Sequence, residues 1–240
     1  ESLREAVATI QPLQVEEAGS HYEILLRMRD EQGALVSPDL FIAAAERYGL
    51  ISNIDRWVVE HAFRWLVSEA DERERLALCS INLSGASLAD NEFLPFVIRQ
   101  FQRSGLDASK ICFEITETAA IASFAQASRF INALKELGCK FALDDFGTGL
   151  SSFGYLKHFP VDYLKIDGSF VKAILHDPID REMVRSINEI GHLTGKKVIA
   201  EWAENQEIIT MLRGMGVDYA QGYGIAEPKR VVMAAVVNGS

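Results

Sequence analysis

Short apolar runs alternate with helical patterns along almost the whole chain, and this alternation constrains the fold more than any other feature. Helices are expected at residues 38–49 and 123–138, which begin and end with residues that helices favour there, and at residues 54–65, where bulky side chains follow a three-and-four spacing. Buried strands are expected at residues 22–28, 76–83, 110–116, 140–145, 161–167 and 197–201. Such alternation indicates a mainly parallel sheet covered by helices.

The length of the chain favours one arrangement of these strands. Divided into eight strand–helix units, 240 residues give roughly 30 residues a unit, which suits an α/β barrel. We therefore expect a TIM-like (β/α)8 barrel, with an open doubly wound sheet as the alternative. No linker divides the sequence, so residues 1–240 are expected to form a single domain. Because the first residue is Glu1 rather than Met, we expect this domain to be a fragment of a longer multidomain protein.

Charge and cysteine content exclude several classes of partner. A net charge of −10 with no basic stripe argues against a nucleic-acid duplex. Three cysteines, Cys79, Cys112 and Cys139, lie in or beside the expected strands, as reduced buried thiols of a cytoplasmic protein do. No apolar run approaches the roughly 18 to 20 residues that span a bilayer. We expect no membrane contact from this segment and a cytoplasmic location, including the cytoplasmic part of a membrane-anchored protein.

Polar side chains interrupt the apolar strands near their carboxyl ends. In an α/β barrel these ends converge on one face, where active sites are built, so residues far apart in sequence would line one pocket. Taken singly, each acid could instead cap a helix or pair with a surface base. The residues concerned are Asn82, Glu114, Asp144, Asp145, Lys165, Asp167 and Glu201.

The adjacent pair Asp144 and Asp145 points to a bound cation. Two neighbouring carboxylates repel each other unless they are exposed, share a proton or are neutralised. Oxygen donors without paired histidines or cysteines are the ligands of Mg²⁺ or Mn²⁺, with Ca²⁺ as a competitor. Two such ions that share a carboxylate suit phosphodiester hydrolysis, and a nearby lysine would hold or activate the water. For Lys165, the alternative is a structural pair with Asp167.

Seven motifs, in order across nearly the whole chain, resemble those of the EAL-domain cyclic-di-GMP phosphodiesterases. They are YEILLR at 22–27, NLS at 82–84, FEITE at 113–117, DDFGTG at 144–149, YLKID at 163–167, AE at 200–201 and QGY at 221–223. The resemblance implies a barrel variant whose first strand runs antiparallel, and hydrolysis of cyclic di-GMP to linear pGpG. It also implies two Mg²⁺ or Mn²⁺ ions and regulatory domains elsewhere in the full-length protein.

The resemblance assigns the metal ligands by position. One ion would be held by Glu23, Asn82, Glu114 and Asp144, and the second ion with its waters would be served by Asp144, Asp145 and Glu201.

The same resemblance assigns four further roles. Lys165 would orient or activate the nucleophilic water, Arg27 would contact a substrate phosphate, and Gln221 would help to order the catalytic site. Glu117 would anchor the loop of residues 146–153, which in the family also connects the site to a dimer interface. A homodimer is therefore implied. For Arg27, the alternative is a surface salt bridge.

The chain departs from the family pattern at a few positions. Ile24 replaces the alanine of the name motif, and its side chain should point away from that of Glu23 because side chains alternate along a strand. Trp202 and Ala203 replace the usual glycine and valine after Glu201.

Two alternatives to an active phosphodiesterase are considered. The first is a binding module of the same family that senses cyclic di-GMP without cleaving it, and the second is an unrelated barrel enzyme that acts on a phosphorylated metabolite. Binding-only members typically lose metal or lysine positions, whereas every one of these positions is present here. The sequence therefore favours the enzyme.

Overall fold

Eight strands form a closed barrel, because the first strand pairs with both the second and the last of them. The computed structural model describes residues 2–13, 19–149 and 153–231, and the side chains of residues 2–7 and 153 are outside this description. The barrel strands follow the order β1 (Ser2–Pro12), β2 (Ser20–Arg29), β4 (Leu76–Leu83), β5 (Ile111–Thr116), β6 (Lys140–Phe146), β7 (Tyr163–Ile166), β8 (Lys197–Ala200) and β9 (Tyr219–Gln221).

One strand runs against the others. β1 is antiparallel to both β2 and β9, whereas β2 and β4 to β9 pair in parallel with one another. Two short strands, β3 (Leu35–Val36) and β10 (Lys229–Arg230), pair with β2 and β1 outside the ring. The predicted barrel with an antiparallel first strand is confirmed, and the open sheet is excluded.

The sequence pattern located six of the barrel strands and missed two. The strands at 76–83, 110–116 and 140–145 were predicted to within a residue or so, but β1 and β9 were not predicted. The eight strands are also not eight equal strand–helix units. Between β6 and β7, the described part of the connection holds only the short η2 (Phe153–Tyr155).

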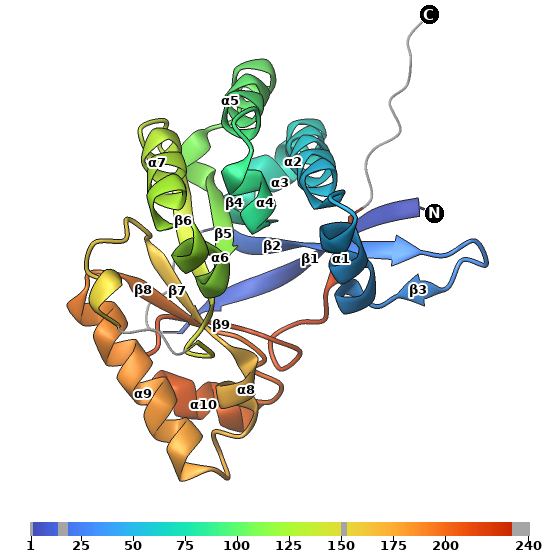
Figure 1. Ribbon diagram of the computed structural model, residues 1–240. Coiled ribbons are helices and arrows are strands. Elements are labelled where there is room, and N and C mark those ends of the chain that lie inside the picture. Colours follow the sequence, from blue (N-terminus) through green and yellow to red (C-terminus); the bar gives the residue numbers. More distant parts are fainter. Residues whose placement is uncertain (1, 14–18, 150–152, 232–240) are drawn as a thin grey trace, which may run out of the picture.

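Helices cover the outside of the barrel in two groups (Figure 1). The first group is α1 (Pro38–Arg47), α2 (Ile51–Ser68), α3 (Ala70–Arg75), α4 (Gly85–Ala89), α5 (Phe93–Ser104), η1 (Ala108–Lys110), α6 (Glu117–Ala122) and α7 (Phe124–Lys135). The second is α8 (Gly168–Lys172), α9 (Pro178–Leu193) and α10 (Gln206–Gly214). The three helices expected from the sequence correspond to α1, α2 and α7.

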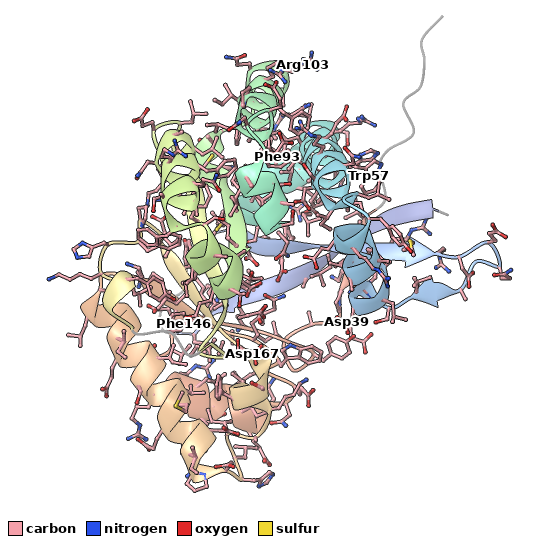
Figure 2. The ribbon with its side chains drawn as sticks, viewed as in Figure 1. Asp39, Trp57, Phe93, Arg103, Phe146 and Asp167 are labelled. Atoms are coloured by element: carbon pink, nitrogen blue, oxygen red, sulfur yellow. The ribbon has the colours of Figure 1, made fainter. Side chains whose placement is uncertain are left out.

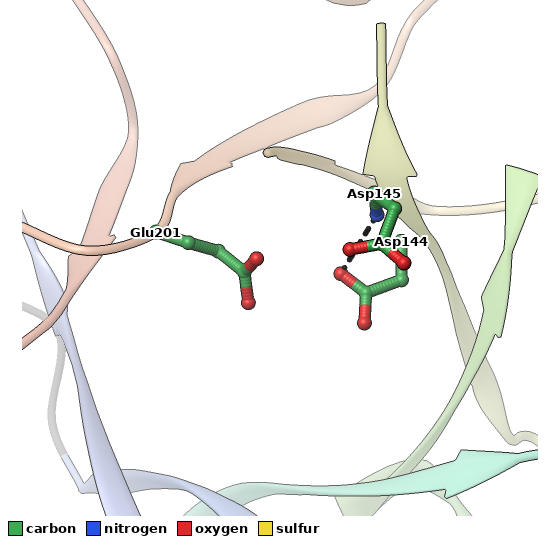
Figure 3. A group of neighbouring side chains, drawn as sticks. All are labelled: Asp144, Asp145 and Glu201. Carbon is green, nitrogen blue, oxygen red and sulfur yellow. Dashed lines mark hydrogen bonds between the residues drawn. The ribbon is translucent and has the colours of Figure 1, made fainter. Parts of the chain in front are cut away.

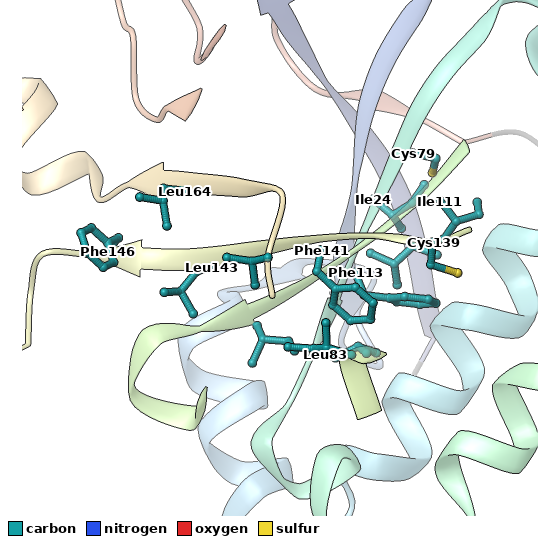
Figure 4. Close-up of a cluster of buried hydrophobic side chains, with 14 of the residues drawn as sticks. Ile24, Cys79, Leu83, Ile111, Phe113, Cys139, Phe141, Leu143, Phe146 and Leu164 are labelled. Atoms are coloured by element: carbon teal, nitrogen blue, oxygen red, sulfur yellow. The ribbon is translucent and has the colours of Figure 1, made fainter. Parts of the chain in front are cut away.

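The main hydrophobic core lies between the barrel and these helices. Phe113 and Phe141 on β5 and β6 pack side by side, with ring centres 5.8 Å apart (Figure 4). Figure 2 shows Phe93 at the start of α5, where it is fully buried, and Arg103 near the other end of the same helix, where it is exposed. Alternation along each strand sends the opposite set of side chains into the barrel. The three cysteines are buried and free, as expected.

A second, smaller group of apolar residues fills the barrel interior. Ile10, Ile199 and Tyr219 pack together there, and Tyr163 packs against them. Along their strands, Tyr163, Ile199 and Tyr219 lie two residues before Lys165, Glu201 and Gln221, on the same face. The apolar group therefore forms a floor beneath the polar residues. Among the described residues, no helix is both long and apolar enough to cross a membrane.

Two aspartates repeat one arrangement at the amino-terminal end of the barrel. Each follows a valine and precedes the first residue of a strand, in the segments 161–163 and 217–219. Asp162 accepts hydrogen bonds from the Phe141 backbone N–H at 3.0 Å and from Lys135 Nζ at 2.9 Å. Each aspartate thus ties its strand to the preceding strand of the barrel.

The second copy of this arrangement is more extensive. Asp218 accepts from the Val198 backbone N–H at 2.9 Å and from Lys197 Nζ at 2.8 Å, and its Oδ2 lies 2.7 Å from His192 Nε2. Burial opposes ionisation of Asp218, but these hydrogen bonds outweigh it and lower its pKa.

Candidate active site

A fully buried lysine lies among four carboxylates at the carboxyl-terminal end of the barrel. Lys165 Nζ on β7 is 2.5 Å from Glu114 Oε2 and 2.8 Å from Glu201 Oε1. It is 3.2 Å from Asp144 Oδ1 and 3.3 Å from Glu23 Oε2. These acids come from β5, the end of β8, β6 and β2, so the structure brings together residues that the sequence placed on separate strands.

The predicted alternative for Lys165, a pair with Asp167, is not what the structure shows. Asp167 instead accepts a hydrogen bond from the Ser169 backbone N–H at 2.9 Å and so caps α8. Lys165 contacts the four inward-facing acids because its side chain points into the barrel.

The electrostatics of the cluster follow from burial and from this single cation. Burial disfavours the charged lysine, but Asp144, Glu114, Glu201 and Glu23 together raise the pKa of Lys165 well above its usual value. Burial, opposed by Lys165, raises the pKa values of Glu114 and Asp144. One lysine therefore compensates its acidic neighbours only in part.

Glu23 is the carboxylate that is best held in its charged form. Its Oε1 accepts a hydrogen bond from Asn82 Nδ2 at 2.7 Å, and its Oε2 accepts one from Gln221 Nε2 at 2.7 Å. Burial raises the pKa of Glu23, but Lys165 and the two amide donors lower it further than burial raises it. The two predicted site amides thus both contact the same acid.

Asp144, Asp145 and Glu201 form a second grouping at the rim. One oxygen atom of each residue lies within 4.8 Å of the others, and Glu201 points across the barrel mouth toward the aspartates (Figure 3). Asp145 has φ +54°, and the β6–β7 register shifts between Leu143 and Phe146. This turn breaks the strand alternation, so both adjacent carboxylates face the same site, as expected.

The rim acids carry raised pKa values. Burial, with smaller contributions from Asp144 and Asp167, raises the pKa of Asp145 to about 6. Burial raises the pKa of Glu201 to about 8, although Lys165 opposes it. Both groups therefore titrate closer to neutrality than an exposed acid does.

This donor set fits divalent cations. The group consists of carboxylate and amide oxygens, which hard cations prefer. Within the described part of the chain, Glu114 Oε1 is buried and has no hydrogen-bond partner. A buried carboxylate oxygen without a donor is costly, and a cation would satisfy it.

Glu117 contacts the loop that follows Asp145. Its Oε2 accepts a hydrogen bond from the Gly147 backbone N–H at 3.1 Å, and its Oε1 accepts one from Tyr155 Oη at 2.6 Å. The sequence indicated Glu117 but not Tyr155. Residues 150–152 of the predicted 146–153 loop lie outside the described residues.

Arg27 lies apart from the carboxylates. Its Nη1 donates to the Leu26 carbonyl at 2.9 Å, and the described residues show no ion pair for it. Its role as a phosphate contact stays a prediction. Ile24 is 2% exposed and packs in the core outside the barrel, away from Glu23, as predicted.

One supporting residue was missed by the sequence reasoning. Asp55 on α2 is buried and accepts hydrogen bonds from the Ser84 N–H and hydroxyl and from the Ser87 hydroxyl. It fixes the start of α4, directly after Asn82 and the end of β4. The signal was available, because Asp55 falls on the otherwise apolar face of its helix.

With this geometry established, comparison with known proteins identifies the family. Residues 4–228 match the family model described as the EAL domain. The chain belongs to the EAL domain family.

Curated relatives of this EAL domain are much longer proteins. It is 42% identical over 207 residues to the cyclic di-GMP phosphodiesterase PdeB of Shewanella oneidensis, covering 86% of this chain and 24% of the relative. It is 38% identical over 224 residues to the cyclic di-GMP phosphodiesterase PdeF of Escherichia coli, covering 92% of this chain and 30% of the relative. The EAL domain thus spans less than a third of each.

Solved structures share the fold of this EAL domain. The FimX EAL domain of Pseudomonas aeruginosa bound to c-di-GMP superposes with a TM-score of 0.87 at 31% identity, covering 97% of this chain and 93% of that one. The PaMucR phosphodiesterase in complex with c-di-GMP gives a TM-score of 0.87 at 29% identity, covering 95% and 92%.

Proposed function

We propose that this EAL domain hydrolyses one phosphodiester bond of cyclic di-GMP to give linear pGpG. The observation that carries the proposal is the convergence of four carboxylates on one buried lysine at the mouth of the barrel, with Asp145 beside two of them. The curated relatives named as cyclic di-GMP phosphodiesterases support the substrate.

Two Mg²⁺ or Mn²⁺ ions would complete the site. When bound, such ions supply positive charge that stabilises the attacking and leaving oxygens of a phosphodiester cleavage. The ligands of the first would be Glu23, Asn82, Glu114 and Asp144, and those of the second would be Asp144, Asp145 and Glu201. The shared carboxylate of Asp144 explains why an adjacent pair of aspartates is tolerated.

Lys165 would orient the attacking water rather than accept its proton. Its pKa is raised well above the usual range by the four surrounding acids, so the side chain is a cation and donates hydrogen bonds.

Arg27 and Glu117 would act on the substrate and on the adjoining loop. Arg27 lies four residues along β2 from Glu23, so its guanidinium could contact a phosphate beside the metal ligands. Glu117 would hold the loop after Asp145 through Gly147 and Tyr155. Coupling of this loop to a homodimer interface, a cytoplasmic location and regulation by further domains stay predictions.

The decisive experiment separates hydrolysis from binding alone. Purified domain would be incubated with cyclic di-GMP and Mg²⁺ or Mn²⁺, with a parallel sample in EDTA, and the nucleotides would be separated by chromatography. We expect pGpG only in the samples that contain the metal. Tight binding of cyclic di-GMP without metal-dependent pGpG would make the domain a receptor instead.

A further inference from the structure

Trp202 has a backbone conformation that a bulky residue rarely adopts. Among the described residues, only Asp145 and Trp202 are non-glycine residues with positive φ, and Trp202 has φ +55°. Both occur at the acid group of Asp144, Asp145 and Glu201. Strained backbone persists only where the surrounding structure imposes it, and it gathers at functional sites.

The indole of Trp202 is held by the helix that follows the Lys165 strand. A Cβ atom on Gly168 would lie only 1.9 Å from Trp202 Cδ1, so the ring rests directly on the glycine at the start of α8. Lys172 Nζ, at the other end of α8, lies 3.5 Å from the ring centre. Because the side chain is 51% exposed, burial alone does not explain this placement.

The residues on either side of Trp202 are fixed by backbone hydrogen bonds. The Glu201 N–H donates to the Ile166 carbonyl at 3.3 Å, and the Ala203 N–H donates to the Gln221 carbonyl at 2.9 Å. The left-handed turn at Trp202 therefore connects two anchored points. It sets the direction in which the chain leaves Glu201 and reaches the contact with Gln221.

We propose that Trp202 is a positioning residue for Glu201. Its indole, held against Gly168 and Lys172, maintains the left-handed turn that directs the Glu201 carboxylate toward Asp144 and Asp145. This inference rests on the proposed function, in which those three acids hold the second metal ion. In this role Trp202 would act through Glu201.

Substitutions at Trp202 distinguish the contribution of the indole ring from the contribution of the backbone conformation. Trp202→Ala removes the indole and penalises the turn, whereas Trp202→Gly removes the indole but permits the turn. We expect Trp202→Ala to weaken Mn²⁺ binding to the metal-stripped protein by about fivefold to thirtyfold, the population change that a left-handed non-glycine residue implies. Trp202→Gly should lose less Mn²⁺ affinity than Trp202→Ala, and Trp202→Phe should keep most of the wild-type affinity.

Gly168→Ala provides a test from the other side of the contact. The added Cβ would displace the indole, so Mn²⁺ affinity should fall in the wild-type background. In the Trp202→Gly background there is no ring to displace, and Gly168→Ala should have no further effect. Thermal melts of each variant would verify that it is folded. This double-mutant cycle reports coupling that a general loss of stability would not produce.

The outcomes distinguish this inference from the proposed function. With cyclic di-GMP as substrate, Trp202→Ala should lower kcat at saturating metal and leave KM unchanged. Normal Mn²⁺ affinity in Trp202→Ala, or equal effects of Gly168→Ala in both backgrounds, would overturn the inference while pGpG formation stands. If wild-type protein binds Mn²⁺ and the variants lose affinity but no pGpG forms, the proposed function fails and the inference holds. Wild-type protein that binds no Mn²⁺ would overturn the positioning role.

Discussion

The two ends of the barrel both carry buried or partly buried acids, but only one end compensates them. At the amino-terminal end, Asp162 and Asp218 each accept a backbone N–H and a lysine. At the carboxyl-terminal end, Lys165 is the one cation that the described part of the chain places against four carboxylates. The pKa of Asp218 is lowered, whereas the pKa values of Asp145 and Glu201 are raised to about 6 and about 8.

On the proposed function, this difference separates an end that contributes stability from an end that contributes chemistry. A carboxylate with donors around it stabilises the fold, while a buried carboxylate without enough donors destabilises it unless a cation binds. In barrels of this class, the amino-terminal face serves stability and the carboxyl-terminal face carries the active site. Substitutions at the amino-terminal end should therefore lower stability and spare activity, whereas substitutions of the acids at the carboxyl-terminal end should lower activity and spare stability.

The largest difference in activity between the two ends should come from Asp144→Asn. Loss of the carboxylate shared by both metal sites should lower kcat/KM for cyclic di-GMP by at least about 100-fold, the scale found when one charge-stabilising group is removed. The melting temperature in EDTA should not fall, because a like-charged neighbour has been neutralised. Asp162→Asn is the matched control and should retain activity. Near-normal turnover by Asp144→Asn would refute the ligand assignment.

Lys165→Met tests the cost of the uncompensated acids directly. Without metal, removal of the only cation that the described residues place in contact with the four carboxylates should destabilise the fold by about 3 to 5 kcal/mol, measured by denaturant unfolding in EDTA. Mn²⁺ should recover part of this stability by binding the folded state. Lys197→Met at the opposite end should lose far less unfolding free energy, and Mn²⁺ should not raise its stability. Equal losses in the two variants would erase the contrast between the ends.

Asp218→Ala should show the reverse profile. It removes the acceptor of the Val198 N–H and of Lys197, so unfolding free energy should fall by about 1 to 3 kcal/mol. Steady-state kinetics should give an unchanged kcat/KM. Asp162→Ala, which repeats the arrangement, should behave alike. A selective loss of activity would show that the amino-terminal end is coupled to the site.

The metal-free protein should also show a pH dependence of stability that originates at the carboxyl-terminal end. Burial raises the pKa of Glu201 from 4.5 to about 8, so between these values the folded state holds a proton that the unfolded chain has released. Stability in EDTA should therefore fall as the pH rises from 5 to about 8. Glu201→Gln should flatten this slope in thermal melts, and Mn²⁺ should do the same. An identical slope in Glu201→Gln would show that the carboxylate is not buried as described.

The elements of the fold that the sequence predicted are those whose hydrophobic pattern lies within one short stretch of the chain. Strands such as β4 and β6 are apolar runs long enough to be recognised, with polar residues where they end. β9 has only three residues, and β1 carries Arg4, Glu5 and Pro12, so neither shows a clear strand pattern. Both are strands because distant segments pair with them, which no local window contains.

The candidate site was predictable by residue type but not by contact. The acids were found because carboxylates interrupt apolar strands. That Lys165 faces four of them, that Asn82 and Gln221 both contact Glu23, and that α8 holds Trp202 depend on how strands far apart in sequence align. The positive φ of Trp202 leaves no trace in composition or periodicity, and the residues that contact its indole, Gly168 and Lys172, lie far from it in sequence.

The pairing of β1 with β9 has a consequence for synthesis of the chain. Ile10 lies opposite Gln221, and the hydrogen bond from Gln221 to Glu23 joins residues 198 positions apart. Contacts of such long range form late, and the ring cannot close until the ribosome has made its last strand. A nascent or prematurely terminated copy therefore lacks a donor to Glu23 and a closed barrel. The proposed activity would begin only with a finished domain, so incomplete translation products could not hydrolyse cyclic di-GMP.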